Sequence, residues 1–182
     1  MQTDEQVIVY TKKWVDDVVI GCNFCPFAAQ VVKQQTIYYR VEHAADIASC
    51  LQTFLDEMEH LDADTGIETV ILIFPDSFPL FDAYLDLVAD AEDLLVEKGY
   101  EGIYQVASFH PQYLFEGAPA NDAANYTNRS VYPMLHLLRE ASIDKALENY
   151  KQPEKIPERN IQFARKKGWL YMRQLKDNCS ET

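Results

Sequence analysis

Two histidines, a group of asparagines and two arginines lie close together in the stretch Phe109–Glu140. His110 follows an apolar segment typical of a strand, and Pro133 precedes the next apolar segment. About twenty residues separate them, and a connection of that length in a compact domain is usually either functional or disordered. The loop also contains several aromatic side chains: Tyr113, Phe115, Tyr126 and Tyr132. Disordered segments are poor in aromatic residues, so we predict that the functional site lies in this loop.

Cys25 is the first candidate for a reactive group, because Cys25-Pro26 is typical of a helix N-cap followed by proline. Unpaired backbone N–H groups at a helix start would stabilise a thiolate and lower its pKa. A nucleophilic thiol needs a base, and His110 ends a predicted parallel strand, where α/β sheets place their ligands. We therefore predict that Cys25 and His110 are catalytic and lie within hydrogen-bond reach. In the alternative, Cys25 is a small buried side chain and loop carbonyls satisfy His110.

Arg129 and Arg139 flank a helix that we predict to begin at Pro133, and its N–H groups would bind a phosphate or carboxylate between them. On that helix, His136 lies three residues before Arg139 and four before Glu140, so all three would share one face. Asn125 or Asn128 would orient the ring of His110. The predicted substrate-binding residues are Asn125, Asn128, Arg129, His136, Arg139 and Glu140. In the alternative they form a structural network, in which Arg129 binds loop carbonyls and Glu140 neutralises Arg139.

Cys22 and Cys25 form a C-x-x-C pair that suggests two other kinds of site. Together with His110 and His136, the pair would supply the ligands of a zinc site. A redox dithiol is less well supported, because thioredoxin-like pairs follow a strand and this one follows a predicted helix. Two unconnected thiols are the remaining alternative, and we assign no metal site.

The charges divide the chain into two parts. The chain has 182 residues, of which 48% are hydrophobic, as expected for one globular domain, and its net charge of −13 argues against binding to nucleic acid. Residues 1–150 carry 8 basic and 25 acidic side chains, whereas residues 151–182 carry 8 basic and 4 acidic ones. We predict that residues 1–150 form an α/β core and that 151–182 are a basic helical extension packed on it, with Trp169 substantially buried.

The chain has no apolar run as long as a membrane span, and its first residues, MQTDEQVIVY, do not resemble a signal peptide. We therefore expect a cytoplasmic protein that does not bind membranes. In a reducing compartment the four cysteines would be free thiols.

Apolar periodicity and turn residues predict the helices and strands. Helices are expected over residues 3–21, 25–34, 44–61 and 79–98, after Pro133, and in the segments 141–150 and 158–167. Strands are expected over residues 37–41, 69–74 and 103–109. The alternating order of strands and helices in the middle of the chain predicts a single α/β domain. We expect a small, mainly parallel sheet of about three strands with a βαβαβ core, flanked by an N-terminal helical hairpin and C-terminal helices.

Three groups of residues resemble a known family. They are Cys25-Pro26-Phe27-Ala28, then Phe109-His110-Pro111, then Thr127-Asn128-Arg129-Ser130 followed by Tyr132-Pro133 and the run 135–140. The order and spacing resemble domain-of-unknown-function family 1415, bacterial and plant proteins of about this length. The family has no assigned activity, so the resemblance implies no functional residue.

The sequence thus favours a small cytoplasmic enzyme that acts on an anionic small molecule through Cys25 or His110. A non-catalytic interaction or regulatory module, with the loop as its binding surface, is the first alternative. A Cys/His zinc-binding protein is the second. The pattern identifies no cofactor, and it does not determine the oligomeric state.

Overall fold

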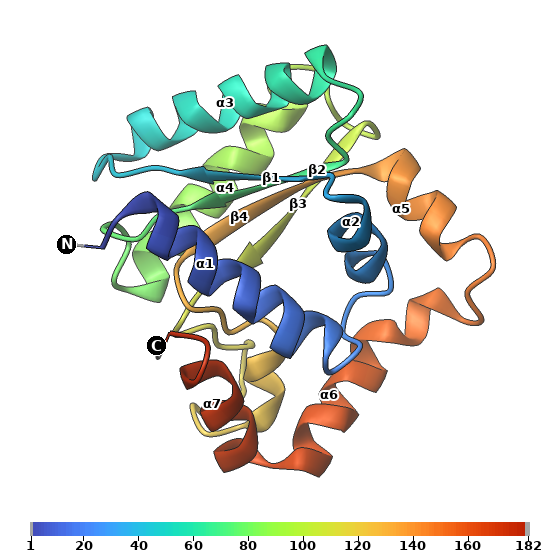
Figure 1. The fold of residues 1–182 in the computed structure, drawn as a ribbon. Coiled ribbons are helices and arrows are strands. Elements are labelled where there is room, and N and C mark those ends of the chain that lie inside the picture. The colour runs from blue at the N-terminus through green and yellow to red at the C-terminus, as the bar shows by residue number, and fades with distance from the viewer. Residues whose placement is uncertain (1, 181–182) are drawn as a thin grey trace.

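A four-stranded sheet lies between two layers of helices in the computed structural model, which describes residues 2–180 (Figure 1). Helices α3 (Ile47–Ala63) and α4 (Phe81–Glu97) cover one face of the sheet. The other face is covered by α1 (Asp4–Trp14) and α2 (Ala28–Gln34), together with the C-terminal helices. The fold is therefore a mixed α/β arrangement around a single sheet.

The sheet contains one strand that the sequence did not predict. Its strands are β1 (Ile37–Val41), β2 (Thr69–Ile73), β3 (Tyr104–Phe109) and β4 (Met134–Arg139), in the order β1-β2-β4-β3. β1 and β2 are parallel, but β4 lies between β2 and β3 and is antiparallel to both. The prediction of a mainly parallel, three-stranded sheet is therefore wrong, and so is the helix predicted after Pro133.

The composition of β4 explains this error. A strand that is buried on both faces of a sheet carries apolar side chains on both faces. Over only six residues, the periodicity of such a segment does not distinguish it from a buried helix. Met134 and Leu138 face the layer of α1 and α2, whereas Leu135 and Leu137 face α3 and α4. β2 shows the same division, with Val70 and Leu72 on the side of α3 and α4. Two separate cores result, one on each face.

The N-terminal helix changes its geometry in the middle. A capping box between Thr3 and Gln6 starts α1. From Val15 the chain continues as a π-helix, η1 (Val15–Ile20), which ends at Gly21. A Cβ atom on residue 21 would lie 2.2 Å from the carbonyl oxygen of Asp17, so this tight turn requires glycine. π-helical turns are rare and often occur at functional sites.

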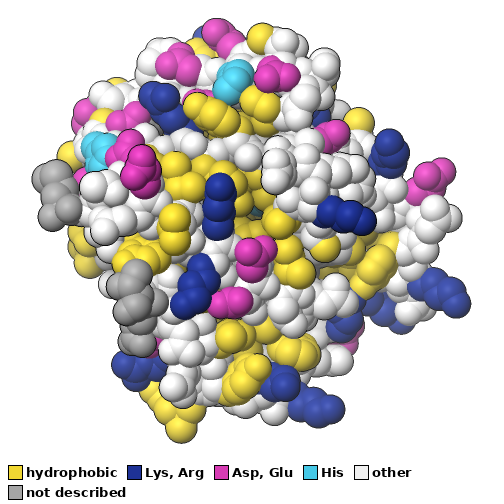
Figure 2. All heavy atoms as spheres, viewed as in Figure 1, with side chains coloured by type: hydrophobic (Ala, Val, Ile, Leu, Met, Phe, Trp, Pro, Cys, Tyr) yellow, Lys and Arg dark blue, Asp and Glu magenta, His cyan; other side chains and the backbone are white. Residues whose placement is uncertain are grey.

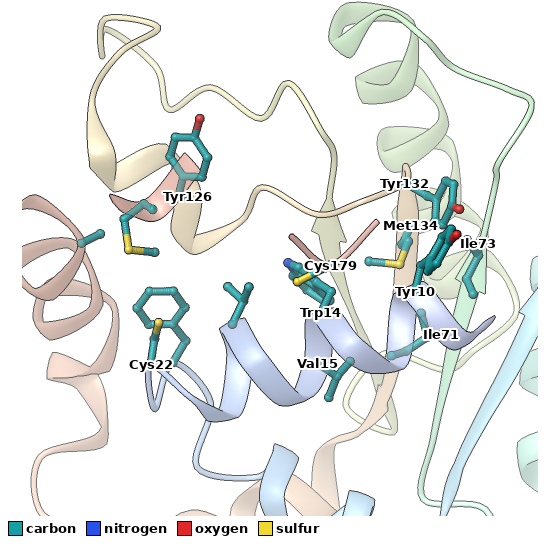
Figure 3. Close-up of a cluster of buried hydrophobic side chains, with 14 of the residues drawn as sticks. Tyr10, Trp14, Val15, Cys22, Ile71, Ile73, Tyr126, Tyr132, Met134 and Cys179 are labelled. Carbon is teal, nitrogen blue, oxygen red and sulfur yellow. The ribbon is translucent and has the colours of Figure 1, made fainter. Parts of the chain in front are cut away.

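The buried side of this helix packs on the sheet. Trp14 is 1% exposed, and its indole N–H donates to the carbonyl oxygen of Arg129 at 3.0 Å. Figure 3 shows Tyr10 and Trp14 extending from α1 into the cluster that contains Met134 of β4. The helix is thereby fixed between the sheet and the long loop.

Two of the C-terminal helices pack on that loop. The C-terminal helices are α5 (Glu140–Leu147), η3 (Pro153–Lys155), α6 (Ile156–Lys167) and α7 (Trp169–Asp177). α6 and α7 contact η2 (Ala123–Thr127), a short 3-10 helix in the loop, and Arg165 forms a 2.8 Å ion pair with Asp122. Ala164 and Met172 are buried, whereas Trp169 is only half-buried.

Charged side chains are distributed unevenly over the surface. Figure 2 shows acidic side chains over α3 and basic ones along the margin formed by the C-terminal helices. The sequence explains this pattern, because residues 41–97 contain fifteen acidic side chains and no lysine or arginine. Among residues 2–180, no helix is both long and apolar enough to cross a membrane.

Candidate functional site

The structure contains an apolar cavity of about 230 Å³ between the sheet and the N-terminal helices. Its floor includes Ile71, Ala107 and His136 from β2, β3 and β4, and its wall includes Trp14 and residues of the π-helix η1. The segment before α2 contributes Cys25, and side chains of α5 and α6 close a further side. In the described part of the chain, no charged side chain lines this cavity.

His136 is the main polar side chain of the floor, and its hydrogen bonds fix its tautomer. Oγ1 of the buried Thr69 lies 2.6 Å from the carbonyl oxygen of Leu137 and 2.7 Å from Nε2 of His136. A carbonyl can only accept, so the single hydroxyl proton is donated to Leu137. The hydroxyl oxygen must then accept a proton from Nε2, and the neutral ring of His136 carries its hydrogen there.

Nδ1 of His136 is consequently a hydrogen-bond acceptor. In residues 2–180 it has no hydrogen-bond partner, while every fully buried side-chain nitrogen and oxygen in that range has one. Nδ1 is therefore accessible, and His136 lines the cavity. Burial lowers the pKa of His136 to about 4, so the ring is neutral at pH 7. The floor thus presents a neutral acceptor within apolar surroundings.

Cys25 lines the same cavity, and it is the only cysteine in the described chain that is not buried. Backbone N–H groups of Phe27 and Ala28 donate to its sulfur and lower its pKa, but burial has the larger effect and raises it. The predicted N-cap at Cys25 is wrong, because α2 begins at Ala28 and its N-cap is Phe27. The prediction of a lowered thiol pKa is wrong, because desolvation exceeds the effect of the two N–H groups.

His110 does not meet Cys25. It follows β3 as predicted, but it is 1% exposed and lines a different pocket, next to Phe78. Nδ1 accepts the backbone N–H of Gln112 at 2.9 Å, and Nε2 lies 2.9 Å from the carbonyl oxygen of Phe78, to which it must donate. Both ring nitrogens are therefore occupied. The predicted hydrogen bond between Cys25 and His110 is wrong, and the alternative of a ring satisfied by the backbone describes His110.

Arg129 holds the long loop together. Its Nε donates to the carbonyl oxygen of Tyr113 at 3.0 Å, and its Nη2 donates to that of Ala120 at 3.1 Å. The guanidinium carbon lies 4.8 Å from the centre of the Tyr126 ring, a cation–π arrangement. These contacts match the structural alternative.

The two loop asparagines also bind backbone groups. The fully buried Asn125 accepts the N–H of Phe115 and donates to the carbonyl oxygen of Pro119, both at 3.0 Å. Asn128 donates to the carbonyl oxygen of Ser108 at 3.3 Å. The backbone carbonyl of Asn128 also accepts the backbone N–H of His110 at 3.2 Å, but the side chain of neither asparagine bonds the ring of His110, so the proposed orientation of that ring is wrong.

Arg139 lies on the opposite face of the sheet from His136. Residues three apart in a strand point to opposite faces, so the predicted shared helix face does not exist. Arg139 donates to the carbonyl oxygens of Ile67, at 3.0 Å, and Leu61. Glu140 is the first residue of α5, and its backbone N–H donates to Ile103. Arg139 thus joins the end of α3 to the sheet.

The predicted zinc ligands are not brought together. Cys22 is buried in the core, and His110 and His136 line different pockets. In the part of the chain that the structure describes, no three His, Cys, Asp or Glu side chains are placed to hold a metal ion.

Sequence reasoning missed Thr69 and the residues of η1. Thr69 meets His136 only through the antiparallel register of β2 and β4, and no local sequence signal announces that pairing. The same register pairs His136 with Ile71 on one side and Ala107 on the other. Gln105, which is exposed beside the cavity on β3, was missed for the same reason.

A family model described as a protein of unknown function (DUF1415) matches residues 6–174. No curated protein and no solved structure matches the chain. The matched range includes Cys25, Thr69 and His136, together with all four strands of the sheet. Since the match covers nearly the whole chain, the protein belongs to the DUF1415 family of proteins of unknown function.

Proposed function

We propose that this protein binds a small, mainly apolar molecule in the cavity between the sheet and η1. One observation carries this proposal: an apolar cavity of about 230 Å³ is lined by the neutral imidazole of His136, whose Nδ1 has no hydrogen-bond partner in the described chain. Ligand sites are typically apolar hollows with a few placed polar groups. A cavity of roughly 150 Å³ is known to hold benzene, so this one has room for a single substituted ring.

This proposed apolar ligand differs from the anionic ligand that the sequence favours. Arg129 and Arg139 would have supplied the positive charge, but each donates to backbone carbonyls outside the cavity. An anion in the cavity would meet no cation there. Transferring a carboxylate into such surroundings without a partner is strongly unfavourable.

The proposal can be tested by adding toluene and measuring the change in the melting temperature of the protein. At ten times its dissociation constant a ligand adds about 1.4 kcal/mol, which should raise the midpoint by roughly 3–6 °C for a protein of this size. An Ala107→Leu variant fills the floor and should lose the response. Ala83 lies exposed on α4, on the other side of the sheet, so Ala83→Leu is the matched control and should retain it. Equal responses in the two variants would place the binding elsewhere.

A thiol-dependent enzyme is a second candidate, favoured by the position of Cys25. Its sulfur borders the cavity and accepts two N–H groups, which would also stabilise negative charge on a reacting molecule. Burial raises the pKa of the thiol above its ordinary value and lowers that of His136 to about 4, so moving the proton from the thiol to the imidazole is energetically costly.

That cost separates the two candidates. A thiolate–imidazolium pair is essentially absent from the free protein, so a thiol mechanism requires proton transfer during attack on a bound substrate. Iodoacetamide labelling of Cys25 at pH 7 should therefore be slow. Fast labelling with a midpoint below the ordinary thiol value would favour the enzyme.

A further inference from the structure

We infer that the ligand of the cavity is an uncharged molecule about the size of one substituted ring, which donates an N–H or O–H to Nδ1 of His136. This inference deepens the proposed binding function and rests on it. It adds the ligand's polarity and the direction of its hydrogen bond.

The direction of that bond follows from Thr69. Its hydroxyl proton is committed to Leu137, so its oxygen accepts the hydrogen on Nε2 of His136. Nδ1 is left with a lone pair and no partner in the described chain. A ligand carbonyl or ether would place two acceptors against each other, whereas a ligand hydroxyl or amine N–H would complete the bond.

The charge of the ligand follows from the remainder of the lining. Trp14 cannot serve as a donor to the ligand, because its indole N–H is already bonded to the carbonyl oxygen of Arg129. Gln105 lines the cavity from an exposed position on β3 and its amide is uncharged, and the thiol of Cys25 is neutral at pH 7. Among the described residues that line the cavity, a cationic ligand would find no carboxylate and an anion would find no cation, so either would lose its hydration without compensation. An uncharged ligand that donates to Nδ1 matches this lining.

Three probes of similar size test this ligand class: phenol, toluene and benzoate. One hydrogen bond adds about 0.5–1.5 kcal/mol, so phenol should bind roughly 2-fold to 12-fold more tightly than toluene. Benzoate should bind more weakly than either. Dissociation constants come from titrations followed by NMR at pH 7. Equal binding of phenol and toluene, or tighter binding of benzoate, would overturn the inference.

The variant His136→Leu replaces the imidazole by an apolar side chain of similar volume and so removes the acceptor Nδ1. It should bind toluene as before and lose the preference for phenol. Ala83→Leu, on α4 and on the other side of the sheet, is the control, and it should keep the preference. An Ala83→Leu protein without the preference would contradict the role of His136.

A second readout uses the wild-type protein and does not depend on the folding of the variant. In a long-range ¹H–¹⁵N spectrum, phenol should shift the Nδ1 resonance of His136, while toluene should leave that resonance almost unmoved. An unmoved resonance at saturating phenol would overturn the inference. If toluene binds but phenol has no advantage, the inference fails while the proposed binding function stands; if neither binds, both fail.

Discussion

Replacement of Thr69 by valine tests the hydrogen bonds that orient His136. Valine keeps the shape of threonine but removes Oγ1, which lies 2.7 Å from Nε2 of His136 and 2.6 Å from the Leu137 carbonyl oxygen. Thr69 is fully buried, so the Nε2 hydrogen would lose its only partner in the described chain. An unsatisfied buried polar group costs about 1–3 kcal/mol. We expect the free energy of unfolding to fall by about 2 kcal/mol.

The matched control is Thr11→Val. Thr11 is also fully buried, but its hydroxyl donates only to the carbonyl oxygen of Val7, one turn earlier in α1. Removing this bond should cost less than about 1 kcal/mol, because a carbonyl with two lone pairs keeps its helix hydrogen bond. Urea unfolding measures both variants. A loss at Thr69 no larger than the loss at Thr11 would refute the assigned hydrogen-bond network.

A double-mutant cycle shows whether the loss passes through His136. In a His136→Leu background, Thr69→Val should cost at least about 0.5 kcal/mol less than in the wild type, since residues in one hydrogen-bond network couple by about 0.5–3 kcal/mol. Additive losses would mean that the two side chains do not interact.

Three further predictions concern His136, Arg129 and the cysteines. The pKa of His136 falls from 6.5 to about 4 on folding, so between these pH values the unfolded chain binds one proton more than the folded chain. As the pH falls from about 6.5 to 4, His136 should therefore lower the free energy of unfolding by about 1.4 kcal/mol per pH unit. Urea unfolding at several pH values should show this slope in the wild type and a reduced one in His136→Leu; identical slopes would exclude His136 as the source. In Arg129→Lys, the lysine cannot make both hydrogen bonds of the guanidinium group, so the free energy of unfolding should fall by about 1–2 kcal/mol while toluene binding is unchanged. Loss of toluene binding with the fold intact would place Arg129 in the site. In native protein, Cys25 should be alkylated before the buried Cys22 and Cys50, as read by peptide mass spectrometry; earlier labelling of either buried thiol would contradict the described packing.

Local patterns predicted much of the fold. The strand over 37–41 matches β1, and the strands near 69–74 and 103–109 match β2 and β3 within one residue at either end. The helices α3 and α4 were also predicted, because amphipathic periodicity is distinct over 17 residues. These elements are determined mainly by their own sequence.

The fourth strand and the site could not be predicted in the same way. His136 belongs to a six-residue, mainly apolar segment whose strand conformation depends on insertion between β2 and β3. Its partnership with Thr69 joins residues that lie 67 positions apart. The sequence drew attention to Cys25 and His136, which line one cavity, but it paired the cysteine with His110, because that pairing assumed a parallel sheet.

Contacts between bound toluene and the floor of the cavity test the proposed binding function most directly. They can be measured as intermolecular NOEs between unlabelled toluene and protein carrying ¹³C-labelled alanine and isoleucine methyl groups. The proposal predicts NOEs to Ala107 and Ile71, which lie on either side of His136 in the sheet. NOEs confined to methyl groups outside the cavity, or no NOEs at saturating toluene, would contradict it.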